Sequence, residues 1–157
     1  MNVNIICVGK LKEKYLKEAQ SEYLKRISRF AKIKIIELND EKLTGSESLD
    51  KIAKNKEGES IINKIPKNSY IFAMDIKGKQ FTSTDFAKEL NSLSVSGKSD
   101  FTFIIGGSLG LSEDVLKIAN KKMSFSLMTF PHQLFRVMLL EQIYRCFKIN
   151  NNETYHK

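Results

Sequence analysis

Cysteine and histidine are scarce in this sequence, which has two of each among its 157 residues. Cys7 and Cys146 lie in apolar segments without a Cys-x-x-Cys pair, so we expect two buried thiols and neither a disulfide framework nor a zinc site. His132 and His156 have no Cys, Asp or His neighbour at the spacing of metal ligands. The sequence therefore predicts a protein without a bound metal ion.

Long apolar runs are absent as well. Stretches such as Val137–Leu140 fall far short of the roughly 18 residues that a membrane span requires. The apolar start of the chain, Met1–Ile6, lacks a basic segment and a small-residue cleavage site, so we interpret it as a first strand and not as a signal peptide. We therefore expect a cytoplasmic protein that has no membrane partner.

No proline-rich linker, internal repeat or low-complexity tract divides the chain, and β-rich runs alternate with helical patterns. We predict strands at 3–8, 33–38, 70–74, 101–105 and 124–128, and helices at 11–30, 49–65, from a cap at Ser83 or Thr84 to 93, from 112 onward and at 131–149. This alternation predicts one α/β domain over residues 1–157, a mostly parallel sheet flanked by helices. Ligands bind such sheets at the carboxyl ends of the strands, which directs attention to the loops Met74–Gly78, Gly106–Gly110 and Thr129–Gln133.

The last predicted helix has almost no polar face between Leu134 and Ile149. A helix that is apolar all round must be covered on more than one side. Either a partner subunit or the rest of this chain provides the cover. In a protein this small a partner subunit is the natural one.

Two nucleotide-binding signatures fail. Gly97-Lys98-Ser99 resembles the end of a P-loop, but the upstream glycine is missing and the triplet precedes a strand instead of following one. The run Gly106–Gly110 has the wrong spacing for a dinucleotide fingerprint and follows the fourth strand, not the first. It is either a tight structural turn or a place where the backbone approaches a ligand closely.

A second candidate site is the segment Thr129-Phe130-Pro131-His132, in which Pro131 opens the last helix. His132 is either a hydrogen-bonding residue of the helix N-terminus or a catalytic group. Arg136 follows one turn later, and Glu141 and Arg145 have the i,i+4 spacing of an ion pair. Cations on such an apolar helix are costly to bury unless they are paired or face a ligand.

A series of markers runs in order along the whole chain: Val8-Gly9-Lys10, Glu57-Gly58, Asp75-x-x-Gly78-Lys79, Ile105-Gly106-Gly107-x-x-Gly110-Leu111, Thr129-Phe130-Pro131-His132, Arg136, Glu141-Gln142-x-Tyr144-Arg145 and Tyr155-His156-Lys157. Together they resemble the RlmH family, the 23S rRNA pseudouridine-N3 methyltransferases of the SPOUT superfamily. No single marker is decisive, but the ordered set is highly specific.

The resemblance implies a SPOUT-type fold with a C-terminal trefoil knot, an exception to the rule that chains are unknotted. It also implies a homodimer that forms through the C-terminal helix. S-adenosylmethionine is then the methyl donor, held in the knot largely by backbone groups. Carried over to this sequence, the contacts come from Met74, Gly106 with Gly107 close by, Phe125, Ser126, Leu127, Met128, Thr129 and Phe130.

The implied reaction moves a methyl group to N3 of a pseudouridine, so the enzyme must position the partners and help the N3 proton leave. His132 or His156 is the candidate proton acceptor. As catalytic residues we nominate His132, Arg136, Tyr155 and His156, with the tail closing over the site of the partner subunit. The alternative for the tail is a frayed terminus.

The implied substrate is 23S rRNA in assembled ribosomes, and the charge of the chain suits a polyanion: 26 Lys and Arg stand against 18 Asp and Glu. A Lys-rich solvated face without a partner is the plainer interpretation of this charge. Basic residues are densest in and beside the first helix, at Lys10, Lys12, Lys14, Lys17, Lys25, Arg26, Arg29, Lys32 and Lys34. Two rival functions remain: a SPOUT methyltransferase that acts on another RNA, and a ribosome-binding or assembly factor without catalysis.

Overall fold

Five parallel strands form one sheet in the order β2-β1-β4-β3-β5. The computed structural model describes all residues, 1–157. Its elements are β1 Asn2–Val8, α1 Lys14–Ile27, β2 Lys32–Leu38, α2 Glu47–Ile62, β3 Tyr70–Gln80, α3 Ser83–Val95, β4 Asp100–Ile105, α4 Glu113–Ile118, β5 Lys121–Ser124 and α5 His132–Asn150. The predicted α/β class with a parallel sheet flanked by helices is confirmed.

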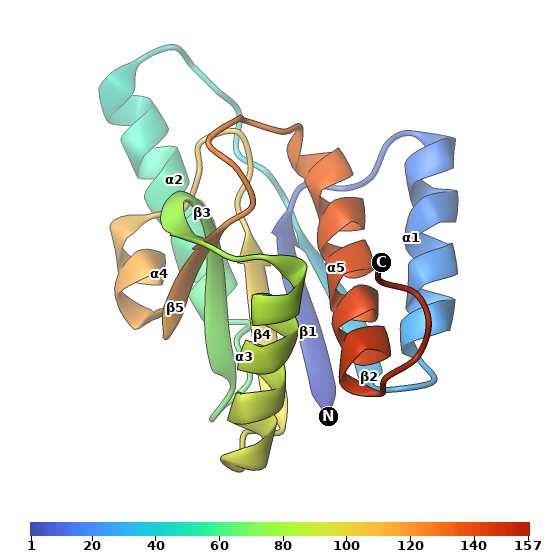
Figure 1. Cartoon of the computed structure of the whole chain (residues 1–157). Helices are drawn as coiled ribbons and strands as arrows, with labels where there is room; N and C mark the ends of the chain where they lie inside the picture. The colour runs from blue at the N-terminus through green and yellow to red at the C-terminus, as the bar shows by residue number, and fades with distance from the viewer.

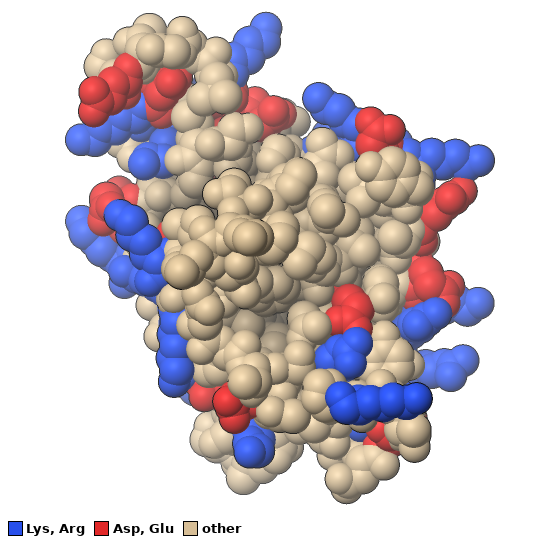
Figure 2. Space-filling model, turned by 45° about the horizontal axis from the view of Figure 1, so that its top comes forward, with Lys and Arg blue, Asp and Glu red and all other residues tan.

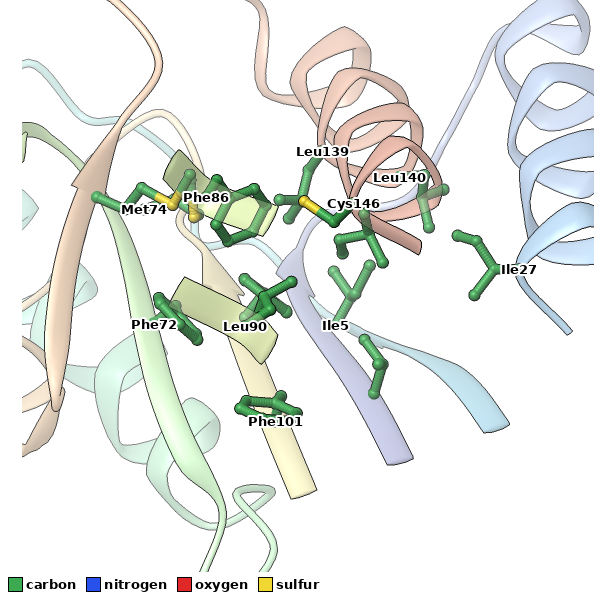
Figure 3. Packing of buried hydrophobic residues seen from close by; sticks show 14 of the residues in the cluster. Ile5, Ile27, Phe72, Met74, Phe86, Leu90, Phe101, Leu139, Leu140 and Cys146 are labelled. Atoms are coloured by element: carbon green, nitrogen blue, oxygen red, sulfur yellow. The ribbon is translucent and has the colours of Figure 1, made fainter. Parts of the chain in front are cut away.

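The helices cover both faces of the sheet in three layers, with α1, α3 and α5 on one face and α2 and α4 on the other (Figure 1). Each face has its own apolar core. The larger core lies under α1, α3 and α5, where Phe72 stacks on Phe103 with ring centroids 4.8 Å apart and Leu139 and Leu140 of α5 close over the sheet (Figure 3). Because both faces of the sheet are covered, burial along β4 is continuous from Phe101 to Ile105 and does not alternate.

The nearly all-apolar helix α5 is largely covered by its own chain. It packs between α1 and α3, and Leu139, Leu140 and Ile143 have no exposed surface. The remaining side is open, however, and Leu134 is 41% exposed. The rest of the chain therefore covers the inner sides of α5, whereas one outer side of the helix is left uncovered.

The fifth strand is shorter and earlier than predicted, because it ends at Ser124 instead of continuing to Met128. The Ser124 hydroxyl donates to the Ser126 carbonyl at 2.9 Å, and the Ser126 hydroxyl accepts from the Met128 N–H at 3.0 Å. These local bonds compete with a strand ladder for the backbone groups and turn the chain away from the sheet. The apolar run 125–130 is therefore a loop and not a strand.

Several further boundaries differ from the prediction, including both ends of α2 and the end of α1 at Ile27. Thr82, not Ser83 or Thr84, caps α3, and its hydroxyl accepts from the Asp85 N–H at 3.1 Å. Helix α1 begins at Lys14 and not at 11, and the Lys12 N–H donates to the Gln133 side chain. Strand β3 continues to Gln80 through a register shift against β5, so the predicted loop Met74–Gly78 lies within the strand.

The remaining structural expectations concern thiols and membranes. Cys7 and Cys146 are both buried and free, as predicted, and burial raises the pKa of Cys7 to about 12. No helix is long and apolar enough to cross a membrane. The trefoil knot stays a prediction.

Candidate functional site

A cleft of about 280 Å³ opens at the carboxyl ends of β4 and β5, beside the part of β3 where its pairing with β4 stops. Each of these neighbouring strands supplies one wall: β3 supplies Met74–Ile76, β4 leads into residues of the turn 105–111, and β5 leads into the segment 123–130. His132 at the start of α5 lies on the remaining side. Three segments that are far apart in sequence meet here because the carboxyl ends of parallel strands point to one edge of the sheet.

Most residues predicted to contact a cofactor line this cleft. They are Met74, Gly106, Gly107, Phe125, Ser126, Met128, Thr129 and Phe130. Leu127 does not line it, and its side chain is 81% exposed. The sequence prediction therefore describes residues that the fold does bring together, whereas their role in binding stays a prediction.

The wall that follows β4 is a tight glycine turn. A side-chain carbon added at Gly106 would lie 2.9 Å from the carbonyl carbon and oxygen of Gly110, so no larger residue fits without a shift. The Gly110 N–H donates to the Gly107 carbonyl at 3.0 Å and closes the turn. The interpretation as a tight turn is confirmed, and the turn also places backbone without side chains at the cleft wall, where the close approach of a ligand stays a prediction.

The cleft has few charged side chains, although the chain has a formal net charge of +8. No Lys or Arg lines it, and Asp75 is its only acidic residue. The other walls combine apolar side chains such as Ile105 and Leu111 with the hydroxyls of Ser108 and Ser124. Such a lining suits an apolar or cationic ligand better than a phosphate, which requires cations or several N–H donors.

His132 lies at the edge of the cleft, half-buried between α5 and the turn after β1. Gly9 is close to the imidazole, since a side-chain carbon added at Gly9 would lie 3.4 Å from Nε2 of His132. Burial lowers the pKa of His132 below its ordinary 6.5, the positive charges of Arg136 and Lys12 lower it further, and Asp40 opposes them. The imidazole is therefore neutral at neutral pH and has a nitrogen that can accept a proton.

Arg136 lies outside the cleft and is 1% exposed. Its guanidinium donates to the Gly9 carbonyl at 2.9 Å and to the Gln20 side chain at 3.4 Å, and pairs with Glu37 at 3.3 Å. These groups come from the ends of β1 and β2 and from α1. The geometry gives Arg136 a positioning role, because it holds the first turn of α5, and with it His132, against the sheet.

Tyr155 and His156 also lie outside the cleft of their own chain. The tail folds back on α5, where the Tyr155 hydroxyl donates to Glu141 at 3.1 Å and His156 Nδ1 lies 3.2 Å from Arg145. The predicted pair of Glu141 and Arg145 is confirmed, with 2.5 Å between them. The Arg145 guanidinium lies 4.7 Å from the centre of the Tyr155 ring. The tail is therefore ordered by four side chains and is not frayed.

Nine cleft residues were not nominated individually from the sequence: Asp75, Ile76, Ile105, Ser108, Gly110, Leu111, Met123, Ser124 and Phe135. Asp75, Ile76, Ser108 and Gly110 had a signal, since they lie in the segments 74–78 and 106–110 to which the sequence directed attention. Phe135 had none, because an apolar residue of an apolar helix is indistinguishable from core. The ring centroids of Phe135 and Phe125 lie 4.7 Å apart, so Phe135 packs against the loop after β5. No group of His, Cys, Asp or Glu is arranged to hold a metal ion.

Known proteins resemble this chain over its whole length. The sequence model of the family described as "Predicted SPOUT methyltransferase" matches residues 1–156. The chain is 57% identical, over all of both proteins, to Ribosomal RNA large subunit methyltransferase H of Clostridium acetobutylicum and to its namesake in Clostridium botulinum. A solved structure described as a probable methylase family protein from Haemophilus influenzae shares the fold, with a TM-score of 0.57, 11% identity, and coverage of 99% of this chain and 70% of that one.

Replacing Arg136 by alanine should destabilise the fold. The change removes a buried charged hydrogen bond and an ion pair whose partner Glu37 is partly exposed, so we expect a loss of about 2–3 kcal/mol in the free energy of unfolding. Urea titration followed by circular dichroism measures it. The matched control is Arg29→Ala, an exposed arginine whose loss should cost less than about 0.5 kcal/mol. Equal stability of the two variants would contradict the positioning role.

Proposed function

Because this chain belongs to the SPOUT methyltransferase family, we propose that it transfers a methyl group from S-adenosylmethionine to N3 of a pseudouridine in 23S rRNA. It acts as a cytoplasmic homodimer on assembled ribosomes. The observation that carries the proposal is the cleft at the carboxyl edge of the sheet, which has a bare glycine turn, one carboxylate and no cation. The full-length identity to proteins named as methyltransferases of large-subunit ribosomal RNA supports the substrate.

The residues of the cleft fit S-adenosylmethionine. The bare turn at Gly106 and Gly107 gives the donor access to backbone groups, and Met74, Phe125 and Phe130 offer apolar surface to its adenine. The single carboxylate of Asp75 and the absence of Lys and Arg suit a sulfonium cation. When bound, the donor supplies an activated methyl group. The chain itself then has to orient the partners and take the N3 proton.

His132 is the proposed acceptor of that proton. It is the only titratable cleft residue besides Asp75, and its lowered pKa keeps a nitrogen lone pair free at neutral pH. We reassign Arg136 from catalysis to positioning, since it lies outside the cleft and its two terminal guanidinium nitrogens contact Glu37, Gln20 and Gly9.

The second copy of the chain is proposed to cover the open side of α5 and the exposed loop after β5. Leu127 and Met128 are 81% and 74% exposed, and Leu134 adds to this apolar surface. The middle of the face in Figure 2 carries no Lys, Arg, Asp or Glu, and the charged side chains gather toward its edges. An exposed apolar surface of this kind marks an interface. In the dimer Tyr155 and His156 would complete the cleft of the partner.

The basic residues beside α1 are the proposed contacts to rRNA phosphates. Lys10, Lys12, Lys14 and Lys17 are exposed, and the Lys12 N–H contacts Gln133 next to His132. Positive charge therefore stands beside the cleft and not inside it. Arg26 is less available than predicted, since it pairs with Glu22 at 2.8 Å and lies over Tyr23. We also propose that the chain is threaded as the trefoil knot that the family implies.

Incubation with methyl-labelled S-adenosylmethionine tests the function directly. With intact ribosomes from cells that lack this activity, we expect label at N3 of one pseudouridine in large-subunit rRNA, mapped by nuclease digestion and mass spectrometry. Free tRNA in the same reaction is the control substrate. Label on tRNA alone would favour another RNA target, and failure to bind the donor would favour a ribosome-binding factor.

Replacing His132 by alanine should remove the acceptor of the N3 proton. At pH 8 we expect kcat/KM to fall by about 10²–10⁴-fold, the usual contribution of a positioned general base. The wild-type rate should decline as the pH drops below 6.5, because His132 has its pKa lowered below this value and becomes protonated there. Loss of this acidic limb in the variant, and partial rescue by added imidazole, would support the role. An unchanged pH profile would contradict it.

Heterodimers test whether the tail serves the partner. One chain carries His132→Ala and its partner lacks residues 155–157, so each chain alone is inactive. If the tail acts in trans, the intact tail of the first chain completes the intact cleft of the second. Mixing should then restore up to about half of the wild-type activity, since one of two sites is whole. No recovery in verified heterodimers would show that the tail acts on its own chain.

A further inference from the structure

Glu57 is the one carboxylate of the chain that is almost fully buried, with 4% of its surface exposed. It lies in the middle of α2, on the face of the sheet opposite α5. Its Oε1 atom accepts from the Glu41 N–H at 2.9 Å, whereas Oε2 is buried without a partner. Burial raises the pKa of Glu57 above its ordinary value, and the acceptance of that N–H opposes the rise. Burying a carboxyl group with one unpartnered oxygen costs folding free energy, so we expect a local role that accounts for it.

Glu57 lies next to the glycine turn. A side-chain carbon added at Gly107 would lie 3.8 Å from Glu57 Oε1 and 3.0 Å from Val8 Cγ1. The turn thus has two sides: one faces the cleft, and the other faces Val8 at the end of β1 and the carboxylate of Glu57.

Gly58, the next residue of α2, lies close to the far end of the same turn. A side-chain carbon at Gly58 would lie 2.1 Å from the hydroxyl and 2.9 Å from Cβ of Ser112. Ser112 is the N-cap of α4 and follows directly on the turn 106–111. Two consecutive residues of α2 therefore meet the turn at both of its ends, and only glycine at 58 permits the second contact.

We propose that Glu57 and Gly58 are positioning residues for the glycine turn of the cleft. They hold the turn from behind, at the place where its backbone meets the methyl donor. The inference rests on the proposed function, because it assigns that ligand to the cleft. A binding wall made of backbone has no side chain of its own to fix it, so its accuracy depends on such support. Neither residue touches the donor.

The experiment compares donor affinity among variants of α2. Glu57→Ala removes the support and should raise the Kd for S-adenosylmethionine at least about tenfold, as measured by isothermal titration calorimetry. Glu57→Gln keeps the shape and the accepting oxygen and should stay within about twofold of the wild type. The matched control is Glu59→Ala, an exposed glutamate of the same helix, which should not change the Kd.

Affinity is measured well below the melting temperature of each variant, so that loss of global stability does not move it. Unchanged affinity in a folded Glu57→Ala protein would overturn the inference, and so would equal weakening by Glu57→Gln. Should the alanine variant fail to fold, Glu57→Asp replaces it, since the shorter side chain withdraws from Glu41 and should weaken binding in the same direction. Wild-type protein that does not bind the donor would instead overturn the proposed function.

Discussion

The hydrogen bonding of β4 between β1 and β3 is the constraint on which the rest of the structure depends. Residues 2–7 of β1 and 70–74 of β3 pair with β4 in parallel. A parallel strand requires a crossover to its neighbour, and crossovers place helices on the faces of the sheet. The strand is consequently buried on both sides, which accounts for the burial of every residue from Phe101 to Ile105. The carboxyl ends of the parallel strands then face one edge, and the cleft forms at the ends of β4 and β5 beside β3.

The distribution of charge follows from that arrangement. The chain has a formal net charge of +8, yet the cleft has no Lys or Arg because its walls are strand ends, a glycine turn and an apolar loop. The cations lie on exposed helix surface, above all on and beside α1. The proposed cationic methyl donor and the proposed polyanionic RNA substrate require opposite surroundings. The cleft without cations and the basic surface beside α1 lie next to each other in this fold.

Two buried charged side chains support the site from opposite faces of the sheet. Arg136 holds the start of α5 to the ends of β1 and β2, which sets the place of His132. Glu57 stands behind the glycine turn on the other face. Neither lines the cleft. Binding residues on loops gain accuracy from such neighbours, because a loop by itself has many accessible conformations.

Local pattern was sufficient for the order and type of the elements. Apolar periodicity located all five strands within a few residues, and only β5 was displaced, because serine hydroxyls compete for its backbone groups. The same pattern directed attention to three segments that border the cleft, although 74–78 proves to lie within β3 and the loop after β5 begins earlier than predicted. It could not decide what Arg136 faces, since a cation on an apolar helix has the same appearance whether it faces a ligand or pairs with a residue such as Glu37.

The sequence by itself determined the α/β class, the parallel sheet, the family and half of the cleft lining, because these depend on periodicity and on short ordered motifs. The tertiary structure alone decided which partners the charged groups meet. Arg136 with Gly9, Glu57 with the glycine turn, and Tyr155 with Glu141 are contacts between segments that only the folded chain brings together. The physical reason is that the free energy of a buried charge depends on neighbours in space, and the order of residues along the chain does not specify these neighbours.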